Sequence, residues 1–442
     1  MSSTDTHKKT VGMIGLGHVG LTLGLTLAEV GFTVRGIDKN KNVTDTLLAG
    51  DTHIHEVGLD ELLAKHLGKN FTIVSDFEEE NRCDIYIITV GTPLNKKLEP
   101  DYGFINSAAD DLAKVIKKGD LIILRSTVPL GTSREKFLPR LLSKSSLAED
   151  EVLIAFAPER TIEGNALHEL RSLPQVVGGL NKESTEEAQD FFSTLTSDVV
   201  IVNSLEEAEI VKLINNAYRE TVFSFANEVS LVAREWGIDT KRVIQAANHG
   251  YARSNIPLPS PGVGGYCLTK DGYLLATSAQ AKNVPLHIIP KTRQVSAEML
   301  HSLANEIHSF LKEHHARNSN PKIALLGFAF KGHPATSDMR GSMTPVLIKR
   351  LQVLLKDPTF IGYDPLVSVE QVQSTGVQAV GSVDEAIVDS DVVVIMNNHS
   401  AFKALPSEMF SRRDQKRLVY DTWGLLNLDD FTQDHSIIYK TL

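Results

Sequence analysis

Residues 8–40 read KKTVGMIGLGHVGLTLGLTLAEVGFTVRGIDKN, and they decide the fold of the first part of the chain. A short apolar strand passes through a glycine-rich turn into an apolar helix, which we expect to reach about Ala28. A second strand, FTVRGID, ends on Asp38. Strand, glycine turn, helix, strand and terminal acid in this order are typical of a dinucleotide-binding unit.

The glycine turn has the spacing GxGxxG at Gly15, Gly17 and Gly20. Gly15 permits a tight turn, Gly17 lets the backbone approach a pyrophosphate, and Gly20 lets the helix and strand pack closely. Such spacing also occurs in purely structural turns, but the flanking strands and helix favour a nucleotide site. The predicted cofactor contacts in this unit are Gly15, Leu16, Gly17, His18, Val19, Gly20 and Asp38.

The acid at position 38 bears on the choice of dinucleotide. A carboxylate there can accept hydrogen bonds from ribose hydroxyls, and it repels a 2′-phosphate, so Asp38 favours NAD over NADP. Lys39 and Lys41 lie close by in the sequence and weaken this preference. We therefore expect NAD as the cofactor.

Three further apolar strands follow at DIYIITVGTP, DLIILRSTVP and VLIAFAPER. Their ends carry Thr92, Thr127 and Glu159. The strand ends of an open parallel sheet line its ligand crevice, so we expect these side chains near the cofactor. The same residue types are also common in ordinary turns, and the pattern alone leaves that reading open.

The same order of elements returns near the C-terminus. PKIALLGFAF predicts a strand, SMTPVLIKRLQVLL a helix, TFIGYD a strand ending on Asp364, and DSDVVVIMNNH another strand. This copy has GFAFKG at the place of the phosphate turn and lacks GxGxxG. We therefore expect it to bind something other than a dinucleotide in the usual way.

Residues 204–239, between the two modules, predict one long helix of about 30 residues, or about 45 Å. Ser204 and Glu207 fit a capping box, and Gly237 is a plausible stop. Lys212 and Asn216 are four residues apart and share one face. Apolar residues at helical spacing suggest a dimer interface or packing within the chain: Ile210, Leu213, Ile214, Ala217, Phe225 and Val229.

These patterns predict an α/β fold with two Rossmann-like, doubly wound parallel-sheet domains, joined by the long helix and a small helical domain. The expected division is residues 1–203 for NAD, 204–315 for the central helical part, and 316–442 for the second α/β domain. A chain of 442 residues is long enough for such a division.

The composition limits the class of protein. With 42% hydrophobic and 23% charged residues, the chain fits a globular protein, and its net charge of -10 argues against broad nucleic-acid binding. The polar start and the absence of a long apolar run lead us to expect a cytoplasmic protein without a membrane anchor. No cysteine or histidine cluster has the spacing of a metal site, so no metal is expected.

The chain has two cysteines, Cys83 and Cys267. Cys83 begins an apolar strand, which favours a packing role. Cys267 lies in PGVGGYCLTKD, directly after a glycine-rich bend, where a reactive thiol is as reasonable as a turn residue. An ammonium group such as Lys212 or Lys270 could lower its pKa, and a thiolate beside an NAD site could oxidise an aldehyde through a thioester.

Several motifs together resemble the nucleotide-sugar 6-dehydrogenase family, which includes UDP-glucose, UDP-N-acetylmannosamine and GDP-mannose dehydrogenases. They are GLGHVG, GTPL, STVPLGT, APERTIEG, KLINNAYRETVFSFANE, PGVGGYCLTKD, GFAFKG and SDMRGS, in that order. The resemblance extends over essentially the whole chain. It implies two successive oxidations at C6 of a sugar, from CH2OH through the aldehyde to the carboxylate, with two NAD and one water, for a polysaccharide pathway.

The resemblance also implies roles for individual residues. Cys267 would carry the thiohemiacetal and thioester, Lys212 and Asn216 would stabilise the oxyanion and position water, and Glu159 would act as general base. Thr127 would help to hold that base and the water and would contact NAD, and Asp271 would support proton transfer near the thiol. Glu163 and Arg340 would contact NAD, together with Thr92. The implied substrate contacts are Glu159, Arg160, Lys212, Asn216, Arg253, Asn255, Gly262, Gly264, Gly265, Phe330 and Lys331.

The motifs are mixed as to the sugar. PER at residues 158–160 and RSNIPLPSPGVGG from Arg253 look more like the N-acetylhexosamine branch, so UDP-N-acetylmannosamine is the first expectation. UDP-N-acetylglucosamine or UDP-N-acetylgalactosamine comes next, then UDP-glucose, which YCLTKD resembles more. MRGS, and Trp423 in DTWG, depart from the usual family pattern, and the sequence gives no role for Tyr266.

Two other functions fit parts of the pattern. A two-electron hydroxyacid or 6-phosphogluconate type dehydrogenase shares the first module and the long helix but needs no thiol. An NAD or nucleotide-sugar sensor would bind the same ligands without turnover. A homodimer through the central helix is the expected assembly, with the UDP-sugar as the other partner.

Overall fold

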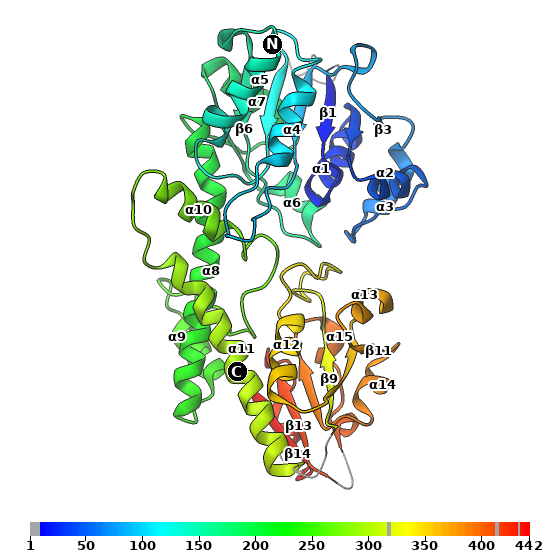
Figure 1. Cartoon of the computed structure of the whole chain (residues 1–442), viewed down its shortest axis with the longest axis vertical. Coiled ribbons are helices and arrows are strands. Elements are labelled where there is room, and N and C mark those ends of the chain that lie inside the picture. Colours follow the sequence, from blue (N-terminus) through cyan, green and yellow to red (C-terminus); the bar gives the residue numbers. More distant parts are fainter. Residues whose placement is uncertain (1–8, 316–319, 412–414, 432–433) are drawn as a thin grey trace. The chain divides into compact units, whose positions relative to one another are not determined.

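The computed structural model describes residues 9–315, 320–411, 415–431 and 434–442. Contacts along the chain divide it into two compact units. The first unit extends to Asn215 and includes Tyr273–Pro285, and the second comprises Asn216–Gly272 and Leu286–Leu442. The division falls inside helix α8 (Leu205–Glu235), which Figure 1 shows in green as one uninterrupted helix. The predicted three-part division at residues 203 and 315 stays a prediction.

The first unit contains a sheet with the strand order β3-β2-β1-β4-β5-β6-β7-β8 among its described residues. Its strands pair in parallel except for β6 and β7, which are antiparallel. The parallel sheet predicted from the sequence is therefore correct from β3 to β6, and the antiparallel step was not predicted. The strands are β1 (Thr10–Ile14), β2 (Thr33–Ile37), β3 (Phe71–Ile73), β4 (Ile85–Ile88), β5 (Leu121–Leu124), β6 (Leu153–Phe156), β7 (Gln175–Gly179) and β8 (Val199–Ile201).

Helices cover both faces of this sheet. On β4, Ile85 and Ile87 join the apolar core that contains α1, whereas Tyr86 and Ile88 join the core that contains α4. This alternation follows from the two-residue period of a strand. The helices are α1 (His18–Glu29), α2 (Lys41–Leu48), α3 (Leu59–His66), α4 (Gly103–Leu112), α5 (Leu138–Lys144), α6 (Ala166–Ser172) and α7 (Lys182–Phe192), with short turns η2 (Glu79–Asn81), η3 (Ser133–Phe137) and η4 (Glu149–Glu151).

The second unit contains the second sheet, in the order β11-β10-β9-β12-β13-β14 among its described residues, and every pairing is parallel. The strands are β9 (Lys322–Leu326), β10 (Thr359–Tyr363), β11 (Gln378–Ala379), β12 (Val392–Ile395), β13 (Arg417–Asp421) and β14 (Ile437–Thr441). The order reverses between β9 and β12, where the ligand crevice of such a sheet lies. The two α/β modules confirm the predicted fold class.

Alternate residues of β12 again enter two cores, one on each face of the sheet. The first of these cores takes in α11 (Ile289–His314) and α12 (Thr344–Leu354), and the second takes in α14 (Val383–Ile387) and α15 (Ser400–Lys403). The remaining elements are α9 (Thr240–Asn248), α13 (Val369–Gln373), η5 (Ser407–Phe410) and η6 (Leu428–Phe431). Helix α10 (Asp271–Gln280) begins at the end of the second unit's Cys267 segment.

The ends of α8 largely agree with the predicted signals. The Ser204 hydroxyl accepts the N–H of Glu207 at 3.1 Å, but the Glu207 carboxylate accepts the N–H of Asn203 at 2.8 Å, one residue earlier than a capping box requires. Gly237 has a φ of 65° and lies just after the last turn, as a glycine stop should.

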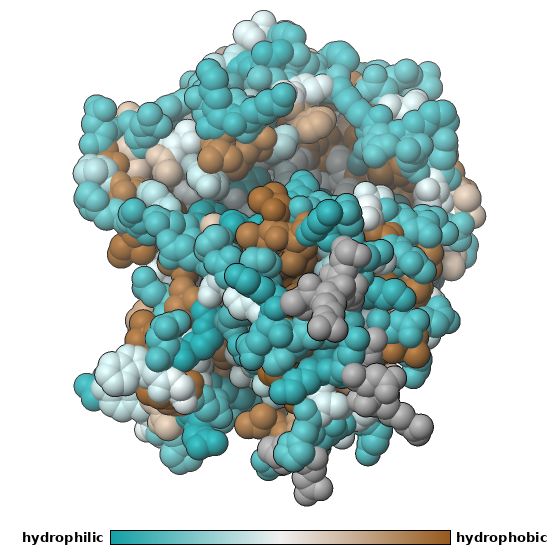
Figure 2. Space-filling view, turned by 60° about the horizontal axis from the view of Figure 1, so that its bottom comes forward, coloured by the Kyte–Doolittle hydropathy of each residue, from teal (hydrophilic) through white to brown (hydrophobic). Residues whose placement is uncertain are grey.

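In the second unit, α8 exposes Tyr218, Phe225, Val232 and Trp236 at near-heptad spacing. These four residues are called the α8 apolar face below. On the face of the molecule seen in Figure 2, hydrophobic residues lie in small groups within a mostly hydrophilic surface.

Candidate active site

The glycine turn after β1 has the geometry of a phosphate-binding turn. Gly15 has a φ of 92°, and its N–H donates to the carbonyl of Ile37 at 2.9 Å, which joins the turn to the end of β2. A Cβ at Gly20 would lie 1.8 Å from the Gly15 carbonyl oxygen, whereas one at Gly17 would meet nothing within 4 Å. Gly20 is thus needed for packing, and Gly17 keeps open the space in front of the α1 N-terminus.

Asp38 is held by the turn and keeps acceptor capacity. One carboxylate oxygen accepts the N–H of Leu16 at 2.8 Å, and the other accepts the N–H of Asn40 at 2.8 Å. A carboxylate has about four acceptor positions, so two remain for ribose hydroxyls. A cavity of about 280 Å³ lies beside it, lined by Ile14, Gly15, Gly17, Ile37, Asp38, Lys39, Asn40, Phe77, Thr89, Val90, Gly91, Phe104, Ser107, Ala108 and Asp111. The apolar wall and the carboxylate suit the adenosine half of NAD.

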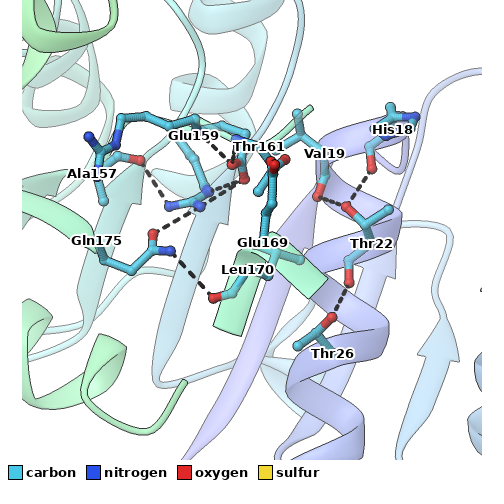
Figure 3. Close-up of polar contacts among 12 residues, drawn as sticks. His18, Val19, Thr22, Thr26, Ala157, Glu159, Thr161, Glu169, Leu170 and Gln175 are labelled. Atoms are coloured by element: carbon cyan, nitrogen blue, oxygen red, sulfur yellow. Dashed lines mark hydrogen bonds and ion pairs between the residues drawn. The ribbon is translucent and has the colours of Figure 1, made fainter. Parts of the chain in front are cut away.

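His18 and Val19 open helix α1, and their carbonyls accept the hydroxyl of Thr22 (Figure 3). The His18 ring lies 3.2 Å from buried Glu56, whose carboxylate also accepts the N–H groups of Gly164 and Ala166. Burial alone would raise the pKa of Glu56, but His18 and the two backbone donors bring it below its ordinary value. Glu56 thus joins the phosphate turn to the half-buried segment that carries Glu163.

Glu159 sits in a buried polar cluster at the end of β6. Arg125, fully buried at the end of β5, donates to one carboxylate oxygen at 2.7 and 3.0 Å and also to the carbonyl of Ala157 and the amide oxygen of Gln175. The other oxygen accepts the N–H groups of Arg160 and Thr161. Figure 3 shows Glu159 at the centre of these contacts.

The charge state of Glu159 results from these contacts. Burial would raise its pKa, but Arg125, the N–H of Thr161 and the ammonium of Lys212 bring the pKa below its ordinary value. The carboxylate is therefore ionised at neutral pH, and its four donors make it a weak proton acceptor. Its role as general base stays a prediction.

The STVPLGT segment is attached to α8 by a carboxyl that the sequence did not single out. Glu209, 1% exposed, accepts the N–H groups of Gly131 and Ser133 at 2.6 and 2.8 Å. Burial raises the pKa of Glu209 to about 7. Half-buried Thr127 precedes this attachment, and Thr92 is 2% exposed, with a hydroxyl that finds no hydrogen-bond partner among the described residues.

In the second unit, the loop before Cys267 packs against the GFAFKG and MRGS segments. Gly265 has a φ of 91°, and a Cβ there would lie 2.8 Å from the Phe330 ring. A Cβ at Gly264 would lie 3.0 Å from the carbonyl oxygen of Gly341, and one at Gly262 would lie 2.9 Å from Met343. Close packing against these segments therefore already favours glycine at the three positions, apart from the predicted approach of the backbone to a substrate.

The two cysteines differ as the sequence suggested. Cys267 is exposed, in the turn before α10, and its carbonyl accepts the N–H groups of Lys270 and Asp271. Cys83 is 1% exposed, and burial raises the pKa of its thiol to about 11. A thiol that stays protonated and buried cannot act as a nucleophile at neutral pH.

Asn216 and Asp271 form a buried pair beside this turn. The Asn216 side-chain amide donates to fully buried Asp271 at 2.6 Å, and the Lys270 ammonium donates to the other oxygen of Asp271 at 2.6 Å. The contact fixes the start of α10 to α8. Lys212 lies one turn before Asn216 on the same helix, which places their side chains on one face of α8.

Other polar side chains fix the Cys267 loop to helices α8 and α11. Arg293 forms an ion pair with Glu220, which is 2% exposed, and donates to the Val263 carbonyl at 3.1 Å. The Asn227 amide oxygen accepts the N–H of Ser260 at 2.8 Å. Nothing in the sequence pointed to Arg293. Asn227 belongs to the KLINNAYRETVFSFANE motif, which was the available signal.

Tyr266, for which the sequence suggested no role, lies under two cations. The Arg340 guanidinium is 4.8 Å from the centre of its ring and the Lys270 ammonium 5.4 Å. Asp338 holds Arg340 through contacts of 2.7 to 3.0 Å. The structure thus joins the SDMRGS segment to the residue before the nucleophile candidate.

The other predicted substrate contacts are Lys331, Arg253, Asn255 and Arg160. Lys331 is half-buried, 5.5 Å from the centre of the Phe330 ring. Arg253 and Asn255 are exposed, and the Arg253 guanidinium lies 4.7 Å from the Tyr251 ring centre. In the first unit, the Arg160 guanidinium donates to the carbonyl of Pro174. The substrate-binding roles of these four residues stay predictions.

The second glycine turn, after β9, differs from the first in the hydrogen bonds that its strand-end acid accepts. Gly327 has a φ of 106° and donates to the Tyr363 carbonyl, as Gly15 does to Ile37. Asp364, however, accepts four backbone N–H groups, from Phe328, Ala329, Leu366 and Val367. Its carboxylate has no acceptor position left for a ribose.

Among the described ranges, no group of three or more His, Cys, Asp or Glu side chains is placed to hold a metal ion. Within the same part of the chain, no helix combines the length and apolar character needed to cross a membrane.

Three family models match successive parts of the chain. They are the NAD binding domain of the UDP-glucose/GDP-mannose dehydrogenase family at residues 9–196, its central domain at 206–298, and its UDP binding domain at 324–428. The chain belongs to this family. As a member of the UDP-glucose/GDP-mannose dehydrogenase family, it is an NAD-dependent oxidoreductase that acts on UDP-sugars, as the motifs predicted.

Individual relatives are similar over nearly the full length. The chain is 29% identical over 428 residues to NDP-N-acetyl-D-galactosaminuronic acid dehydrogenase of Ralstonia nicotianae, covering 95% of this chain and 97% of that protein. It is 30% identical over 407 residues to UDP-N-acetyl-D-mannosamine dehydrogenase of Escherichia coli K12, covering 90% and 95%. The solved UDP-N-acetylmannosamine dehydrogenase of Pyrococcus horikoshii matches at a TM-score of 0.87 and 27% identity, over 98% of each chain.

Proposed function

We propose that the protein oxidises the C6 hydroxymethyl group of a UDP-sugar to a carboxylate in two steps, with Cys267 as the covalent carrier. The observation that carries this proposal is the exposed Cys267 thiol, on a loop that packs against the GFAFKG segment of the UDP-binding module. The family match supports NAD and a UDP-sugar as the reactants. Bound NAD accepts one hydride in each oxidation.

The chemistry at Cys267 conserves atoms and electrons at each step. The first oxidation removes a hydride and a proton from the C6 alcohol and leaves an aldehyde. The thiolate adds to the aldehyde carbon to form a thiohemiacetal, and loss of a second hydride gives a thioester. Water then breaks the C–S bond, which releases the carboxylate and restores the thiol.

Lys212 and Asn216 support this sequence through their shared face of α8. Each addition to a carbonyl carbon places negative charge on oxygen, and an ammonium and an amide N–H are suitable donors to that oxygen. Lys212 is buried, and its charge contributes to the lowered pKa of Glu159. Asp271 holds the Asn216 amide, so we assign it a positioning role beside the predicted one in proton transfer.

For the sugar we propose UDP-N-acetylmannosamine. The PER and RSNIPLPSPGVGG motifs and the relatives with that substrate in their names support this choice. UDP-N-acetylgalactosamine is the second candidate, because a relative of similar identity is named for N-acetylgalactosaminuronic acid. A reduced thiol also supports a cytoplasmic location, where thiols are kept reduced.

We further propose a homodimer through the α8 apolar face. Tyr218, Phe225, Val232 and Trp236 are 51% to 78% exposed, and a second copy of the same face would cover them. The mass of the wild-type protein in solution tests this, since a monomer at micromolar concentration contradicts it.

A panel of UDP-sugars, with the NADH formed per limiting sugar as readout, tests the reaction. We expect two NADH per sugar for the wild type and a UDP-uronate as product. Cys267→Ala should lower the rate of uronate formation by about a thousandfold or more, because the covalent route is lost. One NADH per sugar would instead indicate a two-electron dehydrogenase.

Cys83→Ala is the matched control, because it removes the other thiol of the chain from a buried site. It should keep the two-NADH stoichiometry. If Cys267→Ala formed uronate as fast as Cys83→Ala, the covalent mechanism would be wrong. If neither the wild type nor Cys83→Ala turned over any sugar of the panel, the sugar assignment would be wrong.

A further inference from the structure

The rim of the NAD cavity carries a lysine next to the acid that favours NAD. Lys39 comes directly after Asp38, and both residues line the cavity. A lysine at this position is a natural partner for the 2′-phosphate of NADP, because an ammonium offsets the charge of a phosphate. The contacts of Lys39 therefore bear on whether the site would accept NADP.

These contacts lie across the cavity, on helix α4. The Lys39 ammonium is 2.7 Å from the Asp111 carboxylate and donates to the Ser107 hydroxyl. Asp111 and Ser107 also line the cavity. Asp111 is 18% exposed, whereas Lys39 is 62% exposed, so the carboxylate is the more fixed partner and the ammonium is turned toward it.

Asp111 is ionised and is shared by two cations. Its other oxygen lies 2.9 Å from the Lys114 ammonium, which is not among the residues that line the cavity. Partial burial would raise the pKa of Asp111, but the bonds from Lys39 and Lys114 bring it below its ordinary value. At neutral pH the rim thus carries two carboxylates, Asp38 and Asp111, with Lys39 bound to one of them.

The second lysine named by the sequence is not available to the ribose either. Lys41 forms an ion pair with Asp45, one turn along α2, at 2.8 Å, and it does not line the cavity. Both cations that weakened the expected NAD preference are therefore paired with carboxylates. The pairing of Lys41 faces solvent, with both side chains more than half exposed, whereas both partners of the Lys39 pairing line the cavity.

We propose that Asp111 is a specificity-determining residue, which selects NAD over NADP by holding Lys39 away from the ribose 2′ position and by adding a second negative charge to the rim. Asp38 rejects the 2′-phosphate directly, and Asp111 removes the cation that would otherwise compensate. Dinucleotide choice in this protein thus depends on a pair of residues from β2 and α4, not on the strand-end acid alone.

The test is the binding of NAD+ and NADP+ to the full-length protein by isothermal titration calorimetry, which needs no sugar and no turnover. Asp111→Asn should raise the ratio of NADP+ affinity to NAD+ affinity about tenfold at low ionic strength, because it removes one charge at close range. The gain should shrink in high salt, since the rim is partly exposed. The ratio is the measure because a general loss of affinity for both dinucleotides cancels in it.

Two further variants complete the test. Asp45→Asn also removes one carboxylate and releases a lysine, but away from the cavity, and it should leave the ratio within about twofold of wild type. Adding Lys39→Ala to Asp111→Asn should cancel part of the gain, because the released Lys39 ammonium contributes to it beside the loss of the Asp111 charge. An unchanged ratio in Asp111→Asn, or an equal gain in Asp45→Asn, would overturn the proposal.

Discussion

The two glycine turns of this chain have a similar backbone conformation, but the acids at the neighbouring strand ends differ in the number of acceptor positions that remain free. Gly15 and Gly327 both adopt a positive φ and both donate to the end of the neighbouring strand. Asp38 accepts two backbone N–H groups and keeps room for a ribose, whereas Asp364 accepts four and is saturated. The strand-end acid can thus accept ribose hydroxyls in the first module, whereas in the second module it binds the protein's own backbone.

The turns also differ in the length of chain between the first glycine and the helix. In the first module, α1 begins at His18, directly after the glycine turn, so its free N–H groups are available to an anionic ligand there. In the second, residues 328–343 intervene before α12. They include the part of GFAFKG after Gly327 and the MRGS segment, and both of these contact the Cys267 loop. The difference indicates that spare acceptor positions on the strand-end acid, more than the acid itself, mark a turn that can bind the ribose of a dinucleotide in the usual way.

The largest expected effect is on the glycine that only the first turn has. Gly20→Ala places a Cβ against the Gly15 carbonyl, and we expect it to destabilise the first unit by about 3 kcal/mol or more. Gly17→Ala meets open space, so it should leave the thermal midpoint nearly unchanged and weaken NAD binding instead. Calorimetric unfolding and NAD titration of both variants measure this, and equal stability losses would contradict the division of roles.

The two acids give the next test. Asp364→Asn leaves backbone N–H groups without acceptors and should cost about 3 kcal/mol of stability, with little change in NAD affinity. Asp38→Asn should do the opposite, with about a tenfold loss of NAD affinity and a smaller loss of stability. Urea unfolding and NAD titration of the pair decide the matter. A loss of NAD affinity in Asp364→Asn alone would refute the comparison.

A change of pH should act on the first unit through Glu209. Because its pKa of about 7 exceeds the ordinary 4.5, the folded state holds this proton more tightly than the unfolded chain. Its contribution to stability therefore falls as pH rises from about 4.5 to 7, by about 2 kcal/mol between pH 5 and 7. Unfolding of the wild type and Glu209→Gln across this range should show a flatter profile for the variant. Parallel profiles would mean that Glu209 ionises normally.

The sequence predicted those parts of the fold that depend on local patterning. The first module, the second module, α8 and its glycine stop all result from apolar periodicity and turn residues, and each is present. The antiparallel pairing of β6 with β7 was not predictable, because strand direction depends on the path of the connecting chain. The Glu207 carboxylate accepts the N–H of Asn203 and not that of Ser204, because a glutamate side chain at a helix start can reach the N–H of either residue.

Residues of the candidate site could be singled out from the sequence only where a chemically suitable side chain lies within a recognisable motif. Cys267, Asp38 and the glycines are in that class. Arg125, Arg293 and Asp111 are not, because each acts through a partner more than 30 residues away in the sequence, and a lone charged residue usually indicates a solvated surface. Their importance is visible only from burial and contact.

The contrast between the buried and the exposed cysteine also makes the wild-type chain convenient for labelling. Cys83 is shielded and Cys267 is open, so a thiol-reactive fluorophore or spin label would attach at one position without any engineered change. That position lies directly after Tyr266, between the Gly262–Gly265 bend and α10, so an attached probe would report on the loop itself. Protection of the thiol from a maleimide would likewise give a binding assay for sugar nucleotides that requires no catalysis.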